Sequence, residues 1–289
     1  MPRVVIPGGS GQLGAALTQR LGDAAVPLSR SQFDLAADDP RRLVDEFGAT
    51  HVVNCAAYNA VDTCESDPEA AAAAVATNQK AVMRLADALL VAGVPLVHLS
   101  TDYVFTGAGP RPRDEGWTEN DAANPDGVYA ATKFAGERAA LQAEAVVLRT
   151  CGLYGRGSDD ANIRKQGGNF VETMLRLSES RDEVSVVDDQ SCTPTSCDDL
   201  ADWIARGLDL PPGLYHATNS GHTTWAEFAR TIFRLASRST RVVPITTDQF
   251  GAPAPRPEDS VLDGRKLDAA LGLRRPHWQD ALKRYLASR

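Results

Sequence analysis

The 289-residue sequence predicts an α/β fold: a doubly wound parallel sheet followed by a smaller α/β lobe. Short apolar, β-branched runs alternate with helical stretches through residues 1–150, a pattern typical of parallel strands buried on both faces. The candidate strands are residues 3–6, 24–28, 51–54, 96–100 and 145–149. Residues 151–289 form the smaller lobe, with helices expected at 170–177 and 224–236. Some of its elements are expected to return to the main sheet, namely 184–187, 198–208 and 214–217.

A glycine-rich turn joins the first candidate strand to the first helix. Gly8, Gly11 and Gly14 form a GxxGxxG pattern at this turn. Gly8 permits the tight turn, Gly11 lets the backbone approach a pyrophosphate, and Gly14 allows the helix to pack closely on the strand. The free N–H groups of the helix N-terminus suit phosphates. Residues 1–150 are therefore predicted to be a dinucleotide-binding Rossmann domain, whose first cofactor contacts are Gly8, Ser10, Gly11, Gln12 and Leu13.

The end of the second strand discriminates between two nicotinamide cofactors. An acidic residue there would accept the adenosine 2′-hydroxyl of NADH, whereas a cation suits the 2′-phosphate of NADPH. Arg30 follows this strand, and no acidic residue precedes Asp34. NADPH is therefore favoured and NADH stays possible, the alternative for Arg30 being a solvated surface residue. Asp34 and Leu35 are expected beside the adenine.

The third and fourth strands extend the same architecture. Ala56 and Ala57 follow the third strand, and their small side chains would let the backbone pass close to the dinucleotide. A long alanine-rich helix is predicted over 68–90, with an interruption near Thr77-Asn78. His98 lies inside the apolar fourth strand, so it is interpreted as a satisfied core histidine rather than a catalytic one.

Tyr129 and Lys133 carry the predicted chemistry. Hydride transfer to a carbonyl carbon leaves charge on the oxygen, so a proton donor must stand ready there. Tyr129 can donate if a nearby cation lowers its pKa from about 10. Lys133 lies one helical turn further on and would share a helix face with it. On the pair alone, a surface tyrosine and a solvated lysine are the alternative.

With these motifs the chain resembles the extended short-chain dehydrogenase/reductase superfamily. Within it, the chain resembles the dTDP-4-dehydrorhamnose reductase family of sugar-nucleotide reductases. The likeness covers nearly the whole chain in order, and its most specific parts are the Ser-Thr-Asp-Tyr-Val-Phe and Asp-Gln…Thr-Pro-Thr runs. The matching segments are 8–14, 54–62, 100–107, 129–137, 148–150, 168–175, 189–195 and 256–267.

The resemblance implies a role for each matching residue. Thr101 would hydrogen-bond the C4 carbonyl, Tyr129 would donate the proton, and Lys133 would hold the nicotinamide ribose. The implied reaction is reduction of dTDP-4-dehydro-6-deoxy-L-mannose to dTDP-L-rhamnose by NAD(P)H. The expected substrate-binding residues are Tyr103, Asn169 and Arg256. Arg256 would fork onto the diphosphate, the alternative being a solvated loop arginine.

Several features bear on the exact reaction. Cys151-Gly152 stands where the family commonly has Ser-Trp, and the loop 157–168 is longer than usual, so a reductase or epimerase of another nucleotide deoxysugar stays open. Tyr103 occupies the place of an acidic residue in related dehydratases, which favours reduction. Asp102 is expected to cap its loop, with catalysis as the alternative. A non-catalytic NADP-binding regulatory subunit is a further possibility, but the intact Thr101, Tyr129 and Lys133 argue against it, because a pure binding module has no need of all three.

Composition limits the partners. A net charge of −8 argues against a nucleic-acid surface. We expect no signal peptide and no membrane span, because no stretch approaches about 20 apolar residues. Five cysteines without CxxC spacing and scattered histidines predict free thiols in a reducing cytoplasm and no metal site. The protein is expected to be a monomer or a homodimer.

Overall fold

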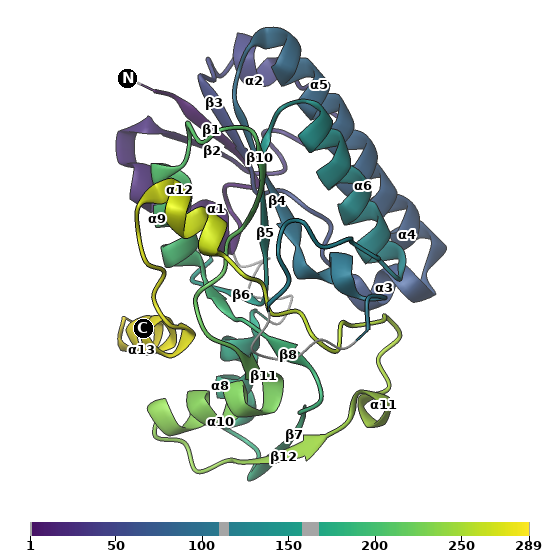
Figure 1. Ribbon diagram of the computed structural model, residues 1–289, viewed down its shortest axis with the longest axis vertical. Coiled ribbons are helices and arrows are strands. Elements are labelled where there is room, and N and C mark those ends of the chain that lie inside the picture. Colours follow the sequence, from purple (N-terminus) through teal and green to yellow (C-terminus); the bar gives the residue numbers. More distant parts are fainter. Residues whose placement is uncertain (1, 110–115, 158–167, 289) are drawn as a thin grey trace.

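A parallel sheet crosses the upper part of the molecule (Figure 1). The computed structural model describes residues 2–109, 116–157 and 168–288, and within these ranges the sheet has six strands, all paired in parallel. In spatial order they are β10 (Gly213–His216), β5 (Val146–Thr150), β4 (Leu96–Thr101), β3 (His51–Asn54), β1 (Val4–Pro7) and β2 (Ala25–Leu28). The predicted doubly wound parallel sheet is confirmed.

Helices cover both faces of this sheet (Figure 1). One face carries α1 (Gln12–Leu21), α9 (Cys197–Arg206) and α12 (Arg265–Leu271). The other face carries α5 (Ala81–Ala92) and α6 (Val128–Gln142). The sheet is therefore the middle layer of a three-layer sandwich, which leaves only its ends open to ligands.

The first strand shows why the strand sequences are apolar throughout. Val4 and Ile6 join the buried cluster that contains Leu17 of α1. Val5, between them, points to the opposite side and joins the cluster that contains Leu85 of α5. Both faces of the strand are buried, so neither face is available to polar side chains.

The strand order places a crevice beside β1. The chain runs from β1 outward to β2 and then crosses to β3 on the other side of β1. At such a reversal, ligands bind beyond the carboxyl ends of the strands. Gly8 lies at this point with a φ of +78°, and a Cβ there would lie only 2.7 Å from the backbone nitrogen of Ala56. The glycine is therefore required both by the backbone conformation and by the approach of the two segments.

The predicted interruption of the alanine-rich helix is confirmed. The segment divides into α4 (Pro68–Ala74), the π-helix η2 (Val75–Lys80) and α5. Asn78, in the π-helix, accepts a hydrogen bond from the Tyr58 backbone N–H and donates one to its carbonyl, at 2.8 and 3.0 Å. A Cβ on Gly136 would lie 2.1 Å from the Asn78 carbonyl oxygen, so α6 packs directly on the π-helix.

The lower part of Figure 1 holds a second layered unit. β7 (Glu183–Val187) pairs in parallel with β12 (Arg241–Ile245), and three helices pack around this ribbon. The helices are α8 (Phe170–Leu177), α10 (Trp225–Leu235) and α13 (Trp278–Ala287). The second unit therefore has a hydrophobic core of its own, separate from the two beside the main sheet.

One expectation about this lobe is wrong. β7 does not return to the main sheet, because Val184 and Val186 face the aromatic core formed with Phe228 and Ile232 of α10. The other two expected returns are confirmed. β10 pairs with β5 at the edge of the sheet, and α9 packs on α1.

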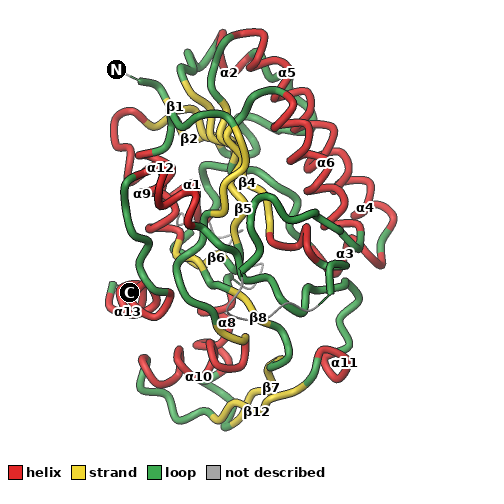
Figure 2. Tube along the Cα trace, viewed as in Figure 1, coloured by secondary structure: helices red, strands yellow, loops and turns green. Residues whose placement is uncertain are grey.

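The remaining elements are shorter, and Figure 2 shows that much of the chain between the main sheet and the second unit is loop. Among the described residues, no helix has both the length and the apolar character that a bilayer span requires. Most of the long loop 157–168 lies outside the described residues. The shorter elements are η1 (Gly22–Ala24), α2 (Arg42–Asp45), α3 (Val61–Ser66), η3 (Asp102–Phe105), β6 (Leu153–Tyr154), β8 (Ser191–Cys192), β9 (Thr195–Ser196), β11 (Thr223–Thr224) and α11 (Thr247–Phe250).

Candidate active site

The end of β4 and the start of α6 bring three predicted residues together. Thr101 is the last residue of β4, and Tyr129 and Lys133 lie in the first turns of α6. All three are buried, and the Tyr129 side chain is hydrogen-bonded to that of Thr101. Gly127 has a φ of +90° and turns the chain into α6 just before Tyr129. A hydroxyl, a phenol and an ammonium thus converge near the carboxyl edge of the sheet.

The Lys133 ammonium is held by the backbone of β4. Its Nζ donates a hydrogen bond to the carbonyl oxygen of Leu99 at 2.6 Å. Burial lowers the Lys133 pKa to about 8, and the carboxylate of Glu137 one turn further along α6 opposes this shift. The amine is therefore poised to change charge near neutral pH, as few lysines are.

The expected effect of Lys133 on Tyr129 is wrong for this arrangement. Burial raises the pKa of Tyr129 above its usual value, and the hydrogen bond between Tyr129 and Thr101 offsets only part of that rise. The physical reason is desolvation, which disfavours the phenolate more than the nearby groups favour it. Tyr129 is consequently protonated at neutral pH, which is the state that a proton donor needs.

Asp102 does not cap the loop after β4 as expected. The cap is Thr101, whose Oγ1 accepts a hydrogen bond from the Tyr103 backbone N–H at 3.2 Å. Asp102 is itself buried, receives a hydrogen bond from Thr101 Oγ1 at 3.1 Å, and also contacts Cys151 and Ser260. Burial raises the pKa of its carboxyl group. Its neighbours supply the hydrogen bonds that such a buried carboxyl requires.

Tyr103 and Arg256 lie beside the three converging residues. The Tyr103 ring meets Tyr129 edge-on, with centroids 5.3 Å apart and an interplanar angle of 90°. Arg256 is hydrogen-bonded to Tyr103, and its two terminal nitrogens reach the carboxylate of Asp62 at 3.0 and 2.9 Å. The predicted role of Arg256 toward a diphosphate stays a prediction. In this structure, Asp62 holds the guanidinium fork.

The glycine-rich turn is held by one backbone hydrogen bond within the turn and one to the end of β2. The Gly9 N–H donates to the Leu28 carbonyl, and the Gly11 N–H donates to the Gly8 carbonyl, each at 3.0 Å. A Cβ on Gly14 would lie 2.4 Å from the Gly8 oxygen. The turn and the first residues of α1 thus form one rigid unit, with backbone amides at the N-terminal end of the helix.

Gln12 is expected to bind the cofactor and Asn169 the substrate, yet their side chains are hydrogen-bonded to each other. Gln12 Oε1 accepts hydrogen bonds from the Gly155 backbone N–H at 3.0 Å and from Asn169 Nδ2 at 2.9 Å. Asn169 is the N-cap of α8 in the second unit, and Gln12 is the first residue of α1 beside the sheet. The sequence alone offered no signal for this contact.

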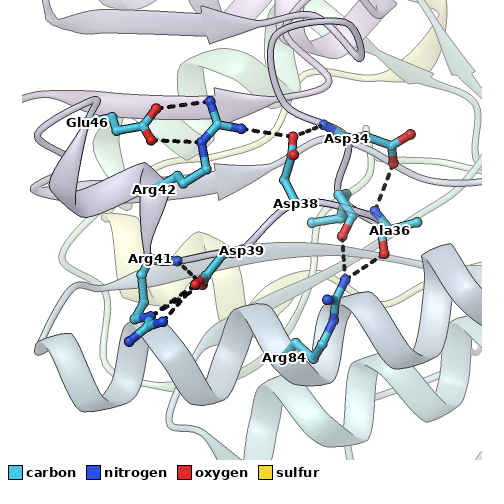
Figure 3. A network of polar contacts seen from close by, with 9 residues as sticks. Asp34, Ala36, Asp38, Asp39, Arg41, Arg42, Glu46 and Arg84 are labelled. Atoms are coloured by element: carbon cyan, nitrogen blue, oxygen red, sulfur yellow. Dashed lines mark hydrogen bonds and ion pairs between the residues drawn. The ribbon is translucent and has the colours of Figure 1, made fainter.

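The region expected to lie beside the adenosine is organised by ion pairs (Figure 3). Arg30 is 83% exposed, and its Nε lies 3.0 Å from Asp34 Oδ2. Leu35 has a buried side chain, and its carbonyl accepts a hydrogen bond from Arg84 of α5 at 3.3 Å. Arg42 then lies between Asp38 and Glu46. Arg30 is therefore accessible to a phosphate, and the segment behind it is fixed to the fold.

Ala56 and Ala57 come just after β3, with Cys55 between Ala56 and the last residue of the strand. The Ala56 N–H donates to Asn54 Oδ1 at 3.1 Å, and Asn54 also contacts His98 Nδ1 at 3.2 Å. His98 is completely buried, and burial holds its pKa well below the usual value. Its Nε2 has no hydrogen-bond partner among the described residues. His98 is thus a neutral core residue, and among the described residues only its Nδ1 has a hydrogen-bond partner.

Gly152, at the position where the family commonly has tryptophan, lies next to the side chain of Trp225. Gly152 has a φ of +53°, and a Cβ there would lie 3.2 Å from the indole of Trp225. Trp225 begins α10 and packs against Phe170, with ring centroids 4.8 Å apart. An aromatic ring therefore stands over this position despite the glycine.

Two buried charges received no role from the sequence. Glu137 accepts hydrogen bonds from both Nε and Nη2 of Arg149, at 2.9 and 2.6 Å, and from Ser100 Oγ at 2.6 Å. The pair joins α6 to β4 and β5 behind Lys133. A charged residue inside the otherwise apolar strand 146–150 was the available signal, because such residues are buried only when paired.

Comparison with known proteins agrees with this geometry. A family model described as RmlD substrate binding domain matches residues 2–289. The chain belongs to this family. A dTDP-4-dehydrorhamnose reductase of Streptomyces griseus is 41% identical over 97% of this chain and 92% of that protein. The spore coat polysaccharide biosynthesis protein SpsK of Bacillus subtilis (strain 168) is 36% identical over 100% and 98%.

Solved structures of the family share the fold. The dTDP-4-dehydrorhamnose reductase of Bacillus anthracis str. Ames, determined in complex with NADP, superposes with a TM-score of 0.90. It is 34% identical and the alignment covers 100% of both chains. A Clostridium acetobutylicum orthologue gives a TM-score of 0.87 at 34% identity, covering 99% of both chains. The family resemblance inferred from the motifs is confirmed.

Proposed function

We propose that this protein reduces the 4-keto group of dTDP-4-dehydro-L-rhamnose to give dTDP-L-rhamnose, with NADPH as the reductant. The observation that carries the proposal is the convergence of Thr101, Tyr129 and Lys133 at the carboxyl edge of a dinucleotide-binding sheet. Reductases of this name are related to the chain along almost its full length. Fold alone would not support the reaction, whereas these three groups do.

Each of the three groups has a task in the reaction. When bound, NADPH supplies the hydride that reaches C4. Thr101 donates a hydrogen bond to the carbonyl oxygen and orients it, and Tyr129 delivers the proton to that oxygen as charge develops. Lys133 holds the nicotinamide ribose and places a positive charge near the phenolate that forms. The burial that keeps Tyr129 protonated also strengthens these interactions, because water is excluded.

The cofactor is proposed to lie across the strand reversal beside β1. The turn from Gly8 to Leu13, with Ser10, Gly11 and Gln12, would hold the pyrophosphate. Arg30 would hold the 2′-phosphate, and its exposed guanidinium supports this.

The remaining proposed contacts concern the adenine, the middle of the dinucleotide and the sugar nucleotide. Asp34 and Leu35 would border the adenine, and Ala56 and Ala57 the middle of the dinucleotide. Residues 1–150 would thus hold the cofactor and residues 151–289 most of the sugar nucleotide. The proposed substrate residues are Asn169 and Arg256 from the second range and Tyr103 from the first.

NADPH oxidation, followed by absorbance, tests the function directly. Purified protein with dTDP-4-dehydro-L-rhamnose should turn over, and Tyr129→Phe should lower kcat by about 100-fold or more while cofactor binding persists. Tyr215→Phe is the matched control, because Tyr215 lies on the edge strand β10 and its hydroxyl donates to the Pro211 carbonyl at 2.9 Å. Full activity of Tyr129→Phe would reject the assigned donor. No turnover by the native protein would reject the substrate.

A second candidate is reduction of another nucleotide deoxysugar by the same groups. Gly152 favours it, because this position carries no side chain of its own and relies on Trp225 for an aromatic surface. A panel of dTDP-4-keto-6-deoxysugars distinguishes the two candidates. A higher kcat/KM for a different sugar would favour the second.

We also propose that the protein works in the cytoplasm as a monomer or homodimer. All five cysteines are free, which suits a reducing compartment. Sedimentation analysis would establish the oligomeric state.

A further inference from the structure

The carboxamide of Gln12 connects the cofactor turn to the second unit. Gln12 is the first residue of α1, directly after the glycine-rich turn. Its Oε1 receives one hydrogen bond from the Gly155 backbone N–H and one from Asn169 Nδ2, at 3.0 and 2.9 Å. Asn169 Nδ2 also donates to the Gly155 carbonyl at 3.0 Å. Three hydrogen bonds therefore close a small network of side chain and backbone across the two units.

The chemistry of the partners fixes the orientation of both carboxamides. Gly155 N–H can only donate, so the Gln12 atom facing it must be the oxygen. Asn169 Oδ1 accepts the Glu172 backbone N–H at 3.0 Å, so its amide nitrogen must be the atom that faces Gln12. In each of these four hydrogen bonds a donor faces an acceptor, and no two donors or two acceptors face each other. A chance surface contact would not satisfy the atoms so fully.

The network leads into the core of the second unit. Asn169 is the N-cap of α8, so the residue that binds Gln12 also stabilises the start of this helix. Within the first turn of α8, Glu172 accepts a hydrogen bond from the Tyr285 hydroxyl of α13 at 2.6 Å. Hydrogen bonds therefore link Gln12 to the start of α8, and α8 to α13.

We propose that Gln12 is a positioning residue that couples occupancy of the cofactor site to the placement of the second unit. Because backbone amides at the start of α1 face the pyrophosphate, bound NADPH restrains the residue whose side chain holds Asn169. α8 is thus held most firmly when the cofactor is present, so the sugar nucleotide meets an ordered site only after the reductant is bound. The inference rests on the proposed function in one respect, namely that the turn holds NADPH.

Hydrogen exchange with NADPH alone tests this coupling. In the native protein, saturating NADPH should slow exchange of the amides of 170–177 by about tenfold, the equivalent of about one hydrogen bond. Gln12→Met retains the length of the side chain and removes its acceptor. It should abolish the protection of α8 while the amides of 8–14 are still protected by the cofactor.

Two further variants separate coupling from simple loss of structure. Asn169→Asp keeps the oxygen that caps α8 but loses both donated hydrogen bonds, so it should behave as Gln12→Met does, with α8 intact. Gln12→Glu keeps an oxygen that accepts both donors, so protection should return once NADPH is saturating. Gln279→Ala, an exposed glutamine in α13, is the matched control and should exchange as the native protein does.

The outcomes are decisive in both directions. Native α8 that is indifferent to NADPH would overturn the proposal, and so would Gln12→Met that keeps the native protection. In steady-state kinetics, Gln12→Met should raise KM for the sugar nucleotide more than it lowers kcat. The exchange experiment needs no sugar, so failure of the proposed substrate would appear as absent turnover with the NADPH-dependent protection unchanged.

Discussion

Asp62 and Arg256 stand 194 residues apart in the sequence, yet they form a two-point ion pair of 3.0 and 2.9 Å. The same carboxylate accepts the Ala254 backbone N–H at 3.3 Å, so it binds the loop as well as the side chain. Pro255 between them approaches Gly127 at the start of α6, where a Cβ would lie 3.1 Å from the proline ring. The pair therefore fastens the proline-rich loop to α3, beside the start of the helix that carries Tyr129.

Asp62→Ala should lower kcat/KM by about tenfold, a change of about 1.4 kcal/mol. The pair is partly exposed, so its loss should lower the free energy of unfolding by only about 1 kcal/mol or less. The larger catalytic effect arises because the freed Arg256 no longer supports Tyr103 beside Tyr129. Asp39→Ala, which breaks an exposed pair with Arg41, is the control for both measurements. Equal catalytic effects of the two substitutions would contradict the assigned role.

Arg30→Ala should change cofactor preference and little else. Arg30 is exposed and bonded only to Asp34 among the contacts described, so its removal should leave folding intact. Loss of a guanidinium–phosphate contact should reduce the ratio of kcat/KM for NADPH over NADH by about tenfold. Activity with NADH should stay close to native. Arg20→Ala, which breaks a similar exposed pair with Asp202, is the control, and a ratio unchanged by Arg30→Ala would refute the prediction.

The sequence predicted the parts of the fold that depend on neighbours in the chain. The apolar runs, the glycine turn and the spacing of Tyr129 and Lys133 all report local geometry, and the structure has each of them. The interruption near Asn78 was visible because polar residues break an alanine-rich helix. Such signals hold wherever the local pattern and the tertiary packing favour the same structure.

The parts that escaped prediction depend on distant partners or on burial. The strand at 183–187 pairs with 241–245, which no periodicity could reveal. The pKa of Tyr129 is set by how completely the packed chain removes water, and the sequence shows only that Lys133 is near. Gln12 looked like one more residue of the cofactor turn, but its side chain serves the second unit. Long-range contacts of this kind leave no local pattern in the sequence.

Gly14→Ala and Gly11→Ala should separate stability from cofactor binding. A Cβ at Gly14 would lie 2.4 Å from the Gly8 oxygen and 2.6 Å from the Gly9 Cα, and both are backbone atoms that cannot step aside. Gly14→Ala should therefore lower the free energy of unfolding without cofactor by about 2 kcal/mol or more. At Gly11 the nearest atom is 3.2 Å away, so stability should fall far less.

Gly11→Ala should instead weaken NADPH binding, because its methyl group would stand where the pyrophosphate approaches the backbone. Urea unfolding measures the first effect, and quenching or enhancement of NADPH fluorescence measures the second. The assigned roles of the two glycines would be contradicted if Gly14→Ala and Gly11→Ala lost the same stability and Gly11→Ala bound NADPH with native affinity.

Lys133→Met should make the protein more stable at pH 7 while abolishing most turnover. Burial lowers the pKa of Lys133 from 10.5 to about 8 in the folded chain. Below pH 8 the lysine is charged in both states, so the folded state carries the full cost of burying that charge, about 3 kcal/mol. Loss of the hydrogen bond to the Leu99 carbonyl offsets about 1 kcal/mol of the gain. The substitution should therefore raise the free energy of unfolding at pH 7 by about 2 kcal/mol.

The stability difference between Lys133→Met and the native protein should depend on pH. Between pH 8 and 10.5 the unfolded chain binds more protons at this site than the folded chain, so the native protein gains stability as pH rises through the window. The advantage of Lys133→Met over the native protein should accordingly shrink between pH 7 and pH 9.5, as measured by urea unfolding. Lys266→Met is the control, because Lys266 also donates to a backbone carbonyl but is exposed. An advantage that is constant with pH would show that Lys133 is not the group that titrates.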